Sequence, residues 1–223
     1  MKNYSAFDVI GPRMIGPSSS HTAGAARIGK VARKICGGEI KNVVFMLHGS
    51  FAKTYRGHGT DKALLAGILG MEPDDKNLRK SMEIARNKGL DYQFSETDLG
   101  EAHPNTVKIK MINEEGNQSE IIGASIGGGN IKITQINGLD VEFTGEYPTL
   151  IIRQIDIPGV IAKVTKIMSA FEINIAFMRV FRQSKGKDAF MFIETDHLVP
   201  KDVIEELIGI GEEIRQVYLI EAL

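Results

Sequence analysis

Hydroxyl and imidazole side chains are concentrated in one short stretch near the start of the chain. Ser18, Ser19, Ser20, His21 and Thr22 follow a Gly-Pro pair and lead directly into a segment with helical periodicity. The free N–H groups and the positive dipole end of a helix attract a carboxylate or phosphate, and nearby hydroxyls add hydrogen bonds. An ordinary helix cap needs only one such residue. The surplus predicts a site for a small anion, with a plain N-cap as the alternative.

Three other polar clusters have the residue types of a binding site. His58 precedes Thr60, a predicted helix cap, so the helix dipole disfavours a charged imidazolium and leaves a ring that can accept a proton. Pro104 holds His103 in an extended conformation and so directs its side chain. The three glycines within residues 125–129 let the backbone approach a ligand and form an anion nest. The structural alternatives are a loop beside a cap, a solvated turn and a strand bulge.

The elements that position these clusters follow from hydrophobic periodicity. Apolar residues at helical spacing predict a helix over residues 22–36, which Gly37 and Gly38 end. The first 147 residues then read as a strand at 43–47, a polar loop at 48–59, helices at 60–69 and 77–88, and strands at 107–111, 119–126 and 131–136. Helices early and antiparallel strands later predict an α+β domain with two layers.

A second domain is predicted from residue 148, after the turn-forming stretch 145–148. Its order is strand, helix, strand, strand, helix, strand, which is the ferredoxin-like βαββαβ arrangement. The strands are predicted at 149–155, 174–181, 189–194 and 216–220. Asp156 and Gly159 belong to the turn that leads from the first strand into a helix, and this helix separates them from Asn174. This spacing predicts that the turn lies next to the start of the second strand, the alternative being that Pro158 and Gly159 simply begin the helix.

Composition excludes several classes of function. The 223 residues are 43% hydrophobic and 25% charged, with a net charge of −1, which is the balance of a soluble globular protein. Neither domain is basic enough to indicate nucleic acid, and no apolar run reaches the roughly 20 residues that cross a bilayer. We therefore expect a cytoplasmic protein that contacts no membrane. Cys36, the single cysteine, allows no internal disulfide and cannot hold a Cys-rich zinc site or an iron–sulfur cluster.

In order along the chain, the motifs resemble those of the β chain of the iron–sulfur-dependent L-serine dehydratases (L-serine ammonia-lyases). The resemblance is carried by residues 7–12, 15–24, 57–62, 103–106 and 125–129, with sequences FDVIGP, IGPSSSHTAG, GHGTDK, HPNT and SIGGG. It covers nearly the whole first domain, and the serine-rich motif is the most specific. The last 75 or so residues resemble an ACT domain. The family's β domain is similar in fold to the allosteric substrate-binding domain of some phosphoglycerate dehydrogenases.

This resemblance implies the conversion of L-serine to pyruvate and ammonia, a step of amino-acid catabolism and gluconeogenesis. A [4Fe–4S] cluster with one open iron acts as a Lewis acid on the serine hydroxyl, while a base removes the α-proton. The family's α chain supplies the cluster cysteines, which agrees with the single cysteine here. We therefore expect no metal ligand on this chain and a cluster-bearing α subunit as its partner.

The resemblance also implies roles for the motif residues. His21 and His58 are expected to form the acid–base or substrate-orienting pair, and the sequence does not decide which of them is the base. The expected substrate-binding residues are Ser18, Ser19, Ser20, Thr22, His103, Asn105, Gly127 and Gly128.

In the ACT domain, the expected regulatory residues are Asp156, Gly159 and Asn174. Gln154 and Asp156 stand where the serine-binding version of this domain has His and Asn, and an aspartate repels a carboxylate. Self-association through the ACT domain is therefore the competing expectation. Two other functions stay open: a non-catalytic module that senses serine or another amino acid, and a purely structural ACT-linked dimer.

Overall fold

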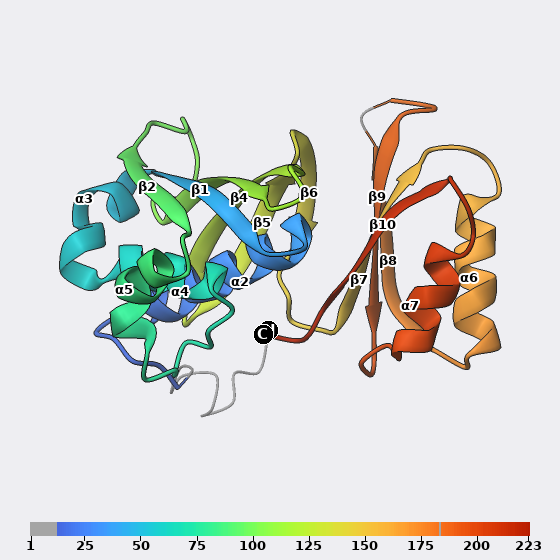
Figure 1. Cartoon of the computed structure of the whole chain (residues 1–223). Helices are drawn as coiled ribbons and strands as arrows, with labels where there is room; N and C mark the ends of the chain where they lie inside the picture. Colours follow the sequence, from blue (N-terminus) through green and yellow to red (C-terminus); the bar gives the residue numbers. More distant parts are fainter. Residues whose placement is uncertain (1–12, 183) are drawn as a thin grey trace, which may run out of the picture. The chain divides into compact units, whose positions relative to one another are not determined.

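The computed structural model describes residues 13–182 and 184–223, so the predicted motif at residues 7–12 lies outside the described part. The chain forms two compact units (Figure 1). The first ends at Thr144, and the second is Gly145–Leu223. The predicted boundary between residues 147 and 148 lies three residues further along the chain than this division.

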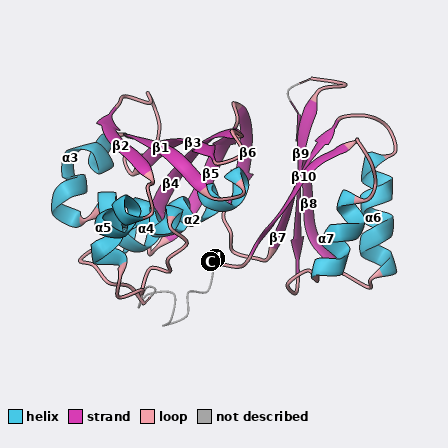
Figure 2. Ribbon diagram, viewed as in Figure 1, coloured by secondary structure: helices cyan, strands magenta, loops and turns pink. Residues whose placement is uncertain are grey.

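The first unit is a six-stranded sheet with helices packed on one of its faces (Figure 2). The strand order is β2-β1-β3-β4-β5-β6, with β1 and β2 parallel and all other neighbours antiparallel. Its strands are β1 (Ile40–Leu47), β2 (Asp91–Glu96), β3 (Thr106–Asn113), β4 (Gln118–Gly127), β5 (Asn130–Ile136) and β6 (Leu139–Phe143). Its helical segments are η1 (Ser19–Gly24, one π-helical turn), α2 (Ala25–Cys36), α3 (Gly49–His58), α4 (Thr60–Ile68), η2 (Leu78–Lys80, 3-10) and α5 (Ser81–Asn87).

Glycines let the main helices approach each other and the sheet. A Cβ atom on Gly67 of α4 would overlap the carbonyl oxygen of Ala26 in α2, and one on Gly29 would overlap the carbonyl of Leu64. Gly123 of β4 likewise leaves room for Ile28 of α2. The two helices are therefore in backbone contact near the point where η1 leads into α2, and the Ile28 side chain packs directly on β4 at Gly123.

The sequence missed three elements of this unit. The predicted polar loop at 48–59 is mostly helix α3, in which Phe51 is the single fully buried residue, so no apolar periodicity marked it. Strands β2 and β6 were also absent from the prediction. β6 is five residues long and follows a tight turn in which Asn137 and Gly138 have positive φ angles of 50° and 78°. The class itself, α+β with two layers, is confirmed.

The second unit has the predicted βαββαβ order. It comprises β7 (Thr149–Ile155), α6 (Val160–Ala170), β8 (Ile175–Arg182), β9 (Asp188–Thr195), α7 (Lys201–Ile208) and β10 (Ile214–Ile220), in the sheet order β10-β7-β9-β8. Helices α6 and α7 cover one face of the sheet (Figure 1). The core between them is aliphatic and includes Leu150, Ile152, Val164, Met191 and Leu207. The ferredoxin-like fold is therefore confirmed.

Candidate functional site

The serine-rich stretch forms the N-terminal end of the first long helix, as predicted. Ser18 is extended (φ −143°) and caps η1, because its Oγ accepts the N–H of His21 at 3.2 Å and its carbonyl accepts the N–H of Thr22 at 2.8 Å. Single π-helical turns occur frequently at functional sites. Residues 18–21 are partly exposed and Thr22 is fully buried. The stretch is therefore open to a ligand over four of its five residues.

His21 is the most constrained polar side chain of this region. Its Nδ1 lies 3.3 Å from Ser18 Oγ and its Nε2 lies 3.4 Å from Ser50 Oγ, with donor and acceptor set by the tautomer. Its ring packs edge-on against Phe51, with centroids 5.3 Å apart, and against His58, with centroids 4.8 Å apart. Burial, and secondarily the charge of His58, lower the pKa of His21. His21 is therefore held as a neutral imidazole at neutral pH.

His58 owes its position to a glycine turn between two helices. It is the last residue of α3, and Gly59 adopts the left-handed conformation (φ 72°) that redirects the chain into α4 at Thr60. The predicted dipole effect comes from the N-terminus of the following helix, but His58 is also the last residue of α3 and so lies at the C-terminal end of that helix's dipole as well. The predicted meeting of the two histidines does occur.

Among the described residues of the first unit, three buried hydroxyls have no hydrogen-bond partner. They belong to Thr22, Thr60 and Ser125, each within one of the predicted motifs. Ser125 on β4 lies directly under Gly24, where a Cβ atom would overlap its Oγ, and Thr22 lies under Gly16 in the same way. Most buried polar atoms in proteins are hydrogen-bonded. Unpaired ones cost stability, so a cluster of them indicates residues that are kept for function.

A cavity of about 470 Å³ opens beside His58. It lies between residues 15–17 and the junction of α3 with α4. Its lining residues are Ile15, Gly16, Pro17, Thr22, Arg56, Gly57, His58, Gly59, Lys62, Leu78 and Arg79. Ser18, Ser19 and Ser20 are not among them, so the serine side chains do not line this cavity.

His103 and Asn105 form a turn that supports the cluster. The carbonyl of Pro104 accepts the N–H of Ser50 at 2.7 Å, and the carbonyl of Asn105 accepts the N–H of Ser125 at 3.0 Å. His103 is exposed, and its Nδ1 accepts the N–H of Asn105 at 3.2 Å. The turn therefore holds α3 and β4 together through backbone hydrogen bonds. Among the described residues, the His103 ring bonds only within the turn, to the N–H of Asn105.

Gly127 and Gly128 form a tight turn between β4 and β5. Their φ angles, 107° and 62°, are left-handed, and Gly129 follows at 84°. Arg27 of α2 donates to the carbonyl of Gly129 at 2.7 Å, which ties this turn to the helix that follows η1. None of these glycines lines the cavity beside His58. Their predicted contact with substrate stays a prediction.

Several residues of the site were missed at the sequence level. Ser50 contacts His21, and Arg56, Lys62 and Arg79 line the cavity. Ser50 follows a buried strand and lies at the start of a helix. A serine at a helix start, as in the serine-rich stretch, is the sequence feature that could have identified it. Arg79 had none, because η2 is a short 3-10 turn far along the chain.

Asp61 is the one carboxylate within the motif around His58. It is 6% exposed, and its Oδ1 accepts the N–H of Lys62 at 2.8 Å. Burial raises the pKa of this carboxyl, against the opposing effects of the Lys62 N–H bond and the nearby cations.

The described residues form no cluster of metal ligands. Within residues 13–182 and 184–223, no group of three or more His, Cys, Asp and Glu side chains is arranged to hold a metal ion. Cys36 is buried, and burial raises the pKa of its thiol. No helix within the described ranges is both long and apolar enough to cross a membrane.

The predicted regulatory residues of the second unit do not converge within one chain. Asp156 follows the end of β7 and bonds Arg182 at the end of β8, at 2.9 Å. Asn174 precedes β8 and bonds Asp196 at 2.8 Å, at the opposite end of the sheet. Strands of seven or eight residues separate these ends by roughly 20 Å. The predicted proximity is wrong, because α6 runs the full length of the sheet before β8 begins.

Residues 5–89 match the family described as "Serine dehydratase beta chain", and residues 149–212 match "ACT domain". The "Probable L-serine dehydratase, beta chain" of Bacillus subtilis is 44% identical over 207 residues, which is 93% of this chain and 94% of that one. The "L-serine dehydratase, beta chain" of Peptoniphilus asaccharolyticus is 44% identical over 211 residues, 94% and 95% of the two chains.

A second group of relatives has a different name. The D-3-phosphoglycerate dehydrogenase of Methanocaldococcus jannaschii is 31% identical over 187 residues, which is 82% of this chain but only 34% of that enzyme. By contrast, the serine dehydratase matches are nearly end to end. The chain therefore belongs to the β-chain family of the L-serine dehydratases and carries a C-terminal ACT domain.

Proposed function

We propose that this chain is the β subunit of an iron–sulfur L-serine ammonia-lyase that converts L-serine to pyruvate and ammonia in the cytoplasm. Its partner is a separate α chain, and the two share one active site. Support comes from the relatives named as L-serine dehydratase β chains. The observation that carries the proposal is the pair of imidazoles, His21 and His58, with centroids 4.8 Å apart beside an open cavity.

The two histidines have different roles in this proposal. His58 lines the cavity, so it is the group that exchanges the α-proton with substrate. His21 lies behind it, between Ser18 and Ser50, and acts as a positioning residue that keeps the pair from carrying two charges. A neutral His58 takes the proton from the α-carbon, the β-hydroxyl leaves with a proton as water, and aminoacrylate remains. Aminoacrylate tautomerises to the imine, and water hydrolyses this to pyruvate and ammonia.

The residues of this chain do not fit an iron–sulfur cluster. A [4Fe–4S] centre is held by several thiolates, and the one thiol here is buried with a raised pKa. We therefore propose that the α chain holds the cluster, and we assign it no step on the residues of this chain.

The decisive test is reconstitution with a cysteine-rich partner chain under anaerobic conditions, followed by an assay for pyruvate. We expect activity only when both chains are present. His58→Gln is expected to lower kcat by about 10²–10⁴-fold, the usual contribution of a general acid–base group. His197→Gln is the matched control, because His197 is an exposed histidine of the second unit. Near-normal turnover of His58→Gln would exclude His58 from proton transfer.

A sensing role without catalysis is the second candidate. The similarity to about one third of the length of D-3-phosphoglycerate dehydrogenases favours it, because the shared region recurs beside other chemistry. Binding of L-serine by a chain that forms no pyruvate with any partner would select this alternative.

We also propose that the ACT domain self-associates. Asp156 and Asn174 lie at opposite ends of one sheet, so only a second copy can bring them together. Arg182 pairs with Asp156, which offsets the repulsion expected between that aspartate and a bound carboxylate. Analytical ultracentrifugation of the full chain, with and without L-serine, tests both statements.

A further inference from the structure

Three cationic side chains surround His58 at the cavity of the first unit. Arg56 comes from α3, Lys62 from α4 and Arg79 from η2, so separate segments of the chain place positive charge at one point. No described residue of the cavity lining is acidic. Within the described ranges, none of the three cations forms an ion pair. The cavity therefore carries positive charge that the described residues lining it do not neutralise.

The acid nearest to these cations does not occupy the cavity. Asp61 interacts electrostatically with Lys62 and Arg56, but its side chain is buried and accepts the backbone N–H of Lys62. The described cavity lining therefore holds three exposed cations and His58, and Asp61 is not part of it. An excess of positive charge is left toward the solvent side, where a ligand would enter.

A hydroxyl without a partner supplies a second, independent indication of a ligand. Thr22 lines the same cavity and is fully buried, and its Oγ1 has no hydrogen-bond partner among the described residues. Carboxylate oxygens accept hydrogen bonds from hydroxyl and guanidinium groups alike.

We propose that Arg56, Lys62 and Arg79 form a binding site for small carboxylate anions, which holds the carboxylate of substrate or product beside His58. This inference rests on the proposed function and refines it. The sequence assigned the carboxylate to the serine hydroxyls, whereas here charged groups take it. The same cations favour proton removal, because negative charge that develops at the α-carbon is delocalised onto the carboxylate they neutralise.

Binding can be tested on the isolated full chain by NMR of the His58 ring protons, titrated with L-lactate and with lactamide. Both probes have the same size, and only L-lactate carries a carboxylate. We expect a saturable shift with L-lactate and none with lactamide. Arg79→Gln and Lys62→Gln are each expected to weaken L-lactate binding at least tenfold.

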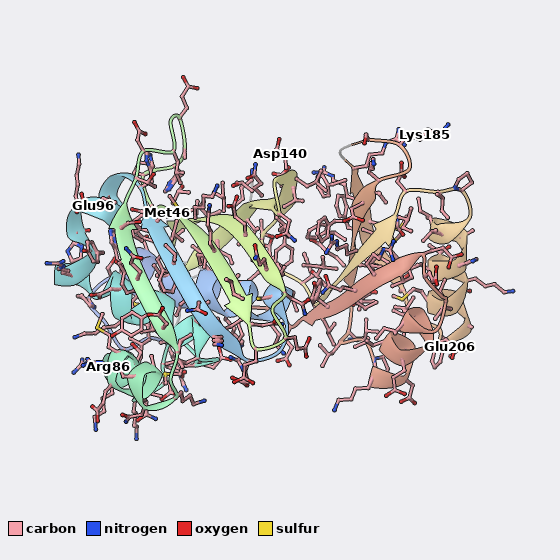
Figure 3. All side chains as sticks on the ribbon, turned by 45° about the horizontal axis from the view of Figure 1, so that its top comes forward. Met46, Arg86, Glu96, Asp140, Lys185 and Glu206 are labelled. Atoms are coloured by element: carbon pink, nitrogen blue, oxygen red, sulfur yellow. The ribbon has the colours of Figure 1, made fainter. Side chains whose placement is uncertain are left out.

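The matched control is Arg86→Gln, which should leave binding within twofold. Arg86 is exposed on α5, does not line the cavity and extends into solvent (Figure 3). The proposal is overturned by any of three results: no saturable shift, equal binding of lactamide, or unchanged binding in both cavity variants. The titration needs neither partner nor cluster, so its outcome is independent of the pyruvate assay.

Discussion

The two units of this chain use their buried polar groups very differently. In the second unit, regular strands and two amphipathic helices enclose an aliphatic core, and Gln154 alone among the described residues there has a buried side-chain atom without a partner. In the first unit, three unpartnered hydroxyls, a π-helical turn and a left-handed glycine junction gather around two histidines. Departures from regular structure are therefore concentrated where chemistry is proposed, as expected when function competes with stability.

The largest expected difference between the two units comes from a substitution at the contact between α2 and α4 in the first unit. Gly67→Ala places a Cβ against the Ala26 carbonyl of α2, which is backbone and cannot move aside cheaply. We expect a loss of about 3 kcal/mol of unfolding free energy. Urea denaturation should show a lowered transition for the first unit.

The control for this variant is Gly209→Ala at the end of α7. Gly209 has an ordinary φ of −68°, and an added Cβ would lie 3.3 Å or more from its neighbours. It should change the free energy of unfolding by less than about 1 kcal/mol. Equal losses in the two variants would contradict the inferred backbone contact between α2 and α4.

Replacing unpartnered polar groups sharpens the contrast. Thr22→Val and Gln154→Met each remove a buried atom that has no hydrogen-bond partner, so each should stabilise the chain by about 1 kcal/mol. Only Thr22→Val should also reduce serine turnover in the reconstituted enzyme. Thermal denaturation measures the change in stability, and the pyruvate assay measures the change in turnover. Full activity of Thr22→Val would show that the unpaired hydroxyl lies outside the site.

Asp61→Asn tests whether a buried charge weakens the first unit. Burial raises the folded-state pKa of Asp61, so the folded protein binds this proton more tightly than the unfolded chain. Stability is therefore lost as pH rises from the unfolded-state value of 3.8 through the folded-state value. We expect Asp61→Asn to gain on the order of 1 kcal/mol at neutral pH and less in acid.

Urea denaturation at pH 7.5 and pH 4.5 measures this difference. Asp74→Asn, at an exposed position, is the control and should show no gain at either pH. A gain that grew toward acid pH would have the wrong sign for a raised pKa.

The smallest expected effect is on the titration of His21. The charge of His58 contributes to the lowered pKa of His21, so His58→Gln should raise that pKa, though not to its ordinary value because burial remains. NMR titration of the histidine ring protons reports the change. His197 serves as the internal reference, and an unchanged His21 would show that the two rings do not interact.

Periodicity explains which elements the sequence could predict. The helix at 22–36 and strands β7 and β9 of the second unit bury apolar side chains, which leaves a pattern in the sequence. Helix α3 buries only Phe51, and its polar residues read as a loop. Its existence depends on tertiary contacts, such as the bond from Ser50 N–H to the Pro104 carbonyl, that no local pattern reveals.

The site was predictable in its residue types but not in its arrangement. The two histidines stand out by their motifs, yet their approach depends on how Gly59 redirects the chain between α3 and α4. The role of the cations was harder still to predict from the sequence, since Arg79 reaches the cavity from a short 3-10 turn whose position is set by packing. The separation of Asp156 from Asn174 follows from the length of α6 and could have been worked out in advance.

Because α3 buries few side chains, it is expected to unfold locally before the rest of the first unit. Phe51 is the one fully buried side chain of a helix that carries Ser50 at its start and His58 at its end. Such a segment opens locally at a small fraction of the global unfolding energy, so its amide hydrogens exchange with solvent ahead of those in α2. We therefore expect α3, which carries the proposed base His58, to be the part of the first unit that heat or a loosening mutation disables first, well before the sheet behind it melts.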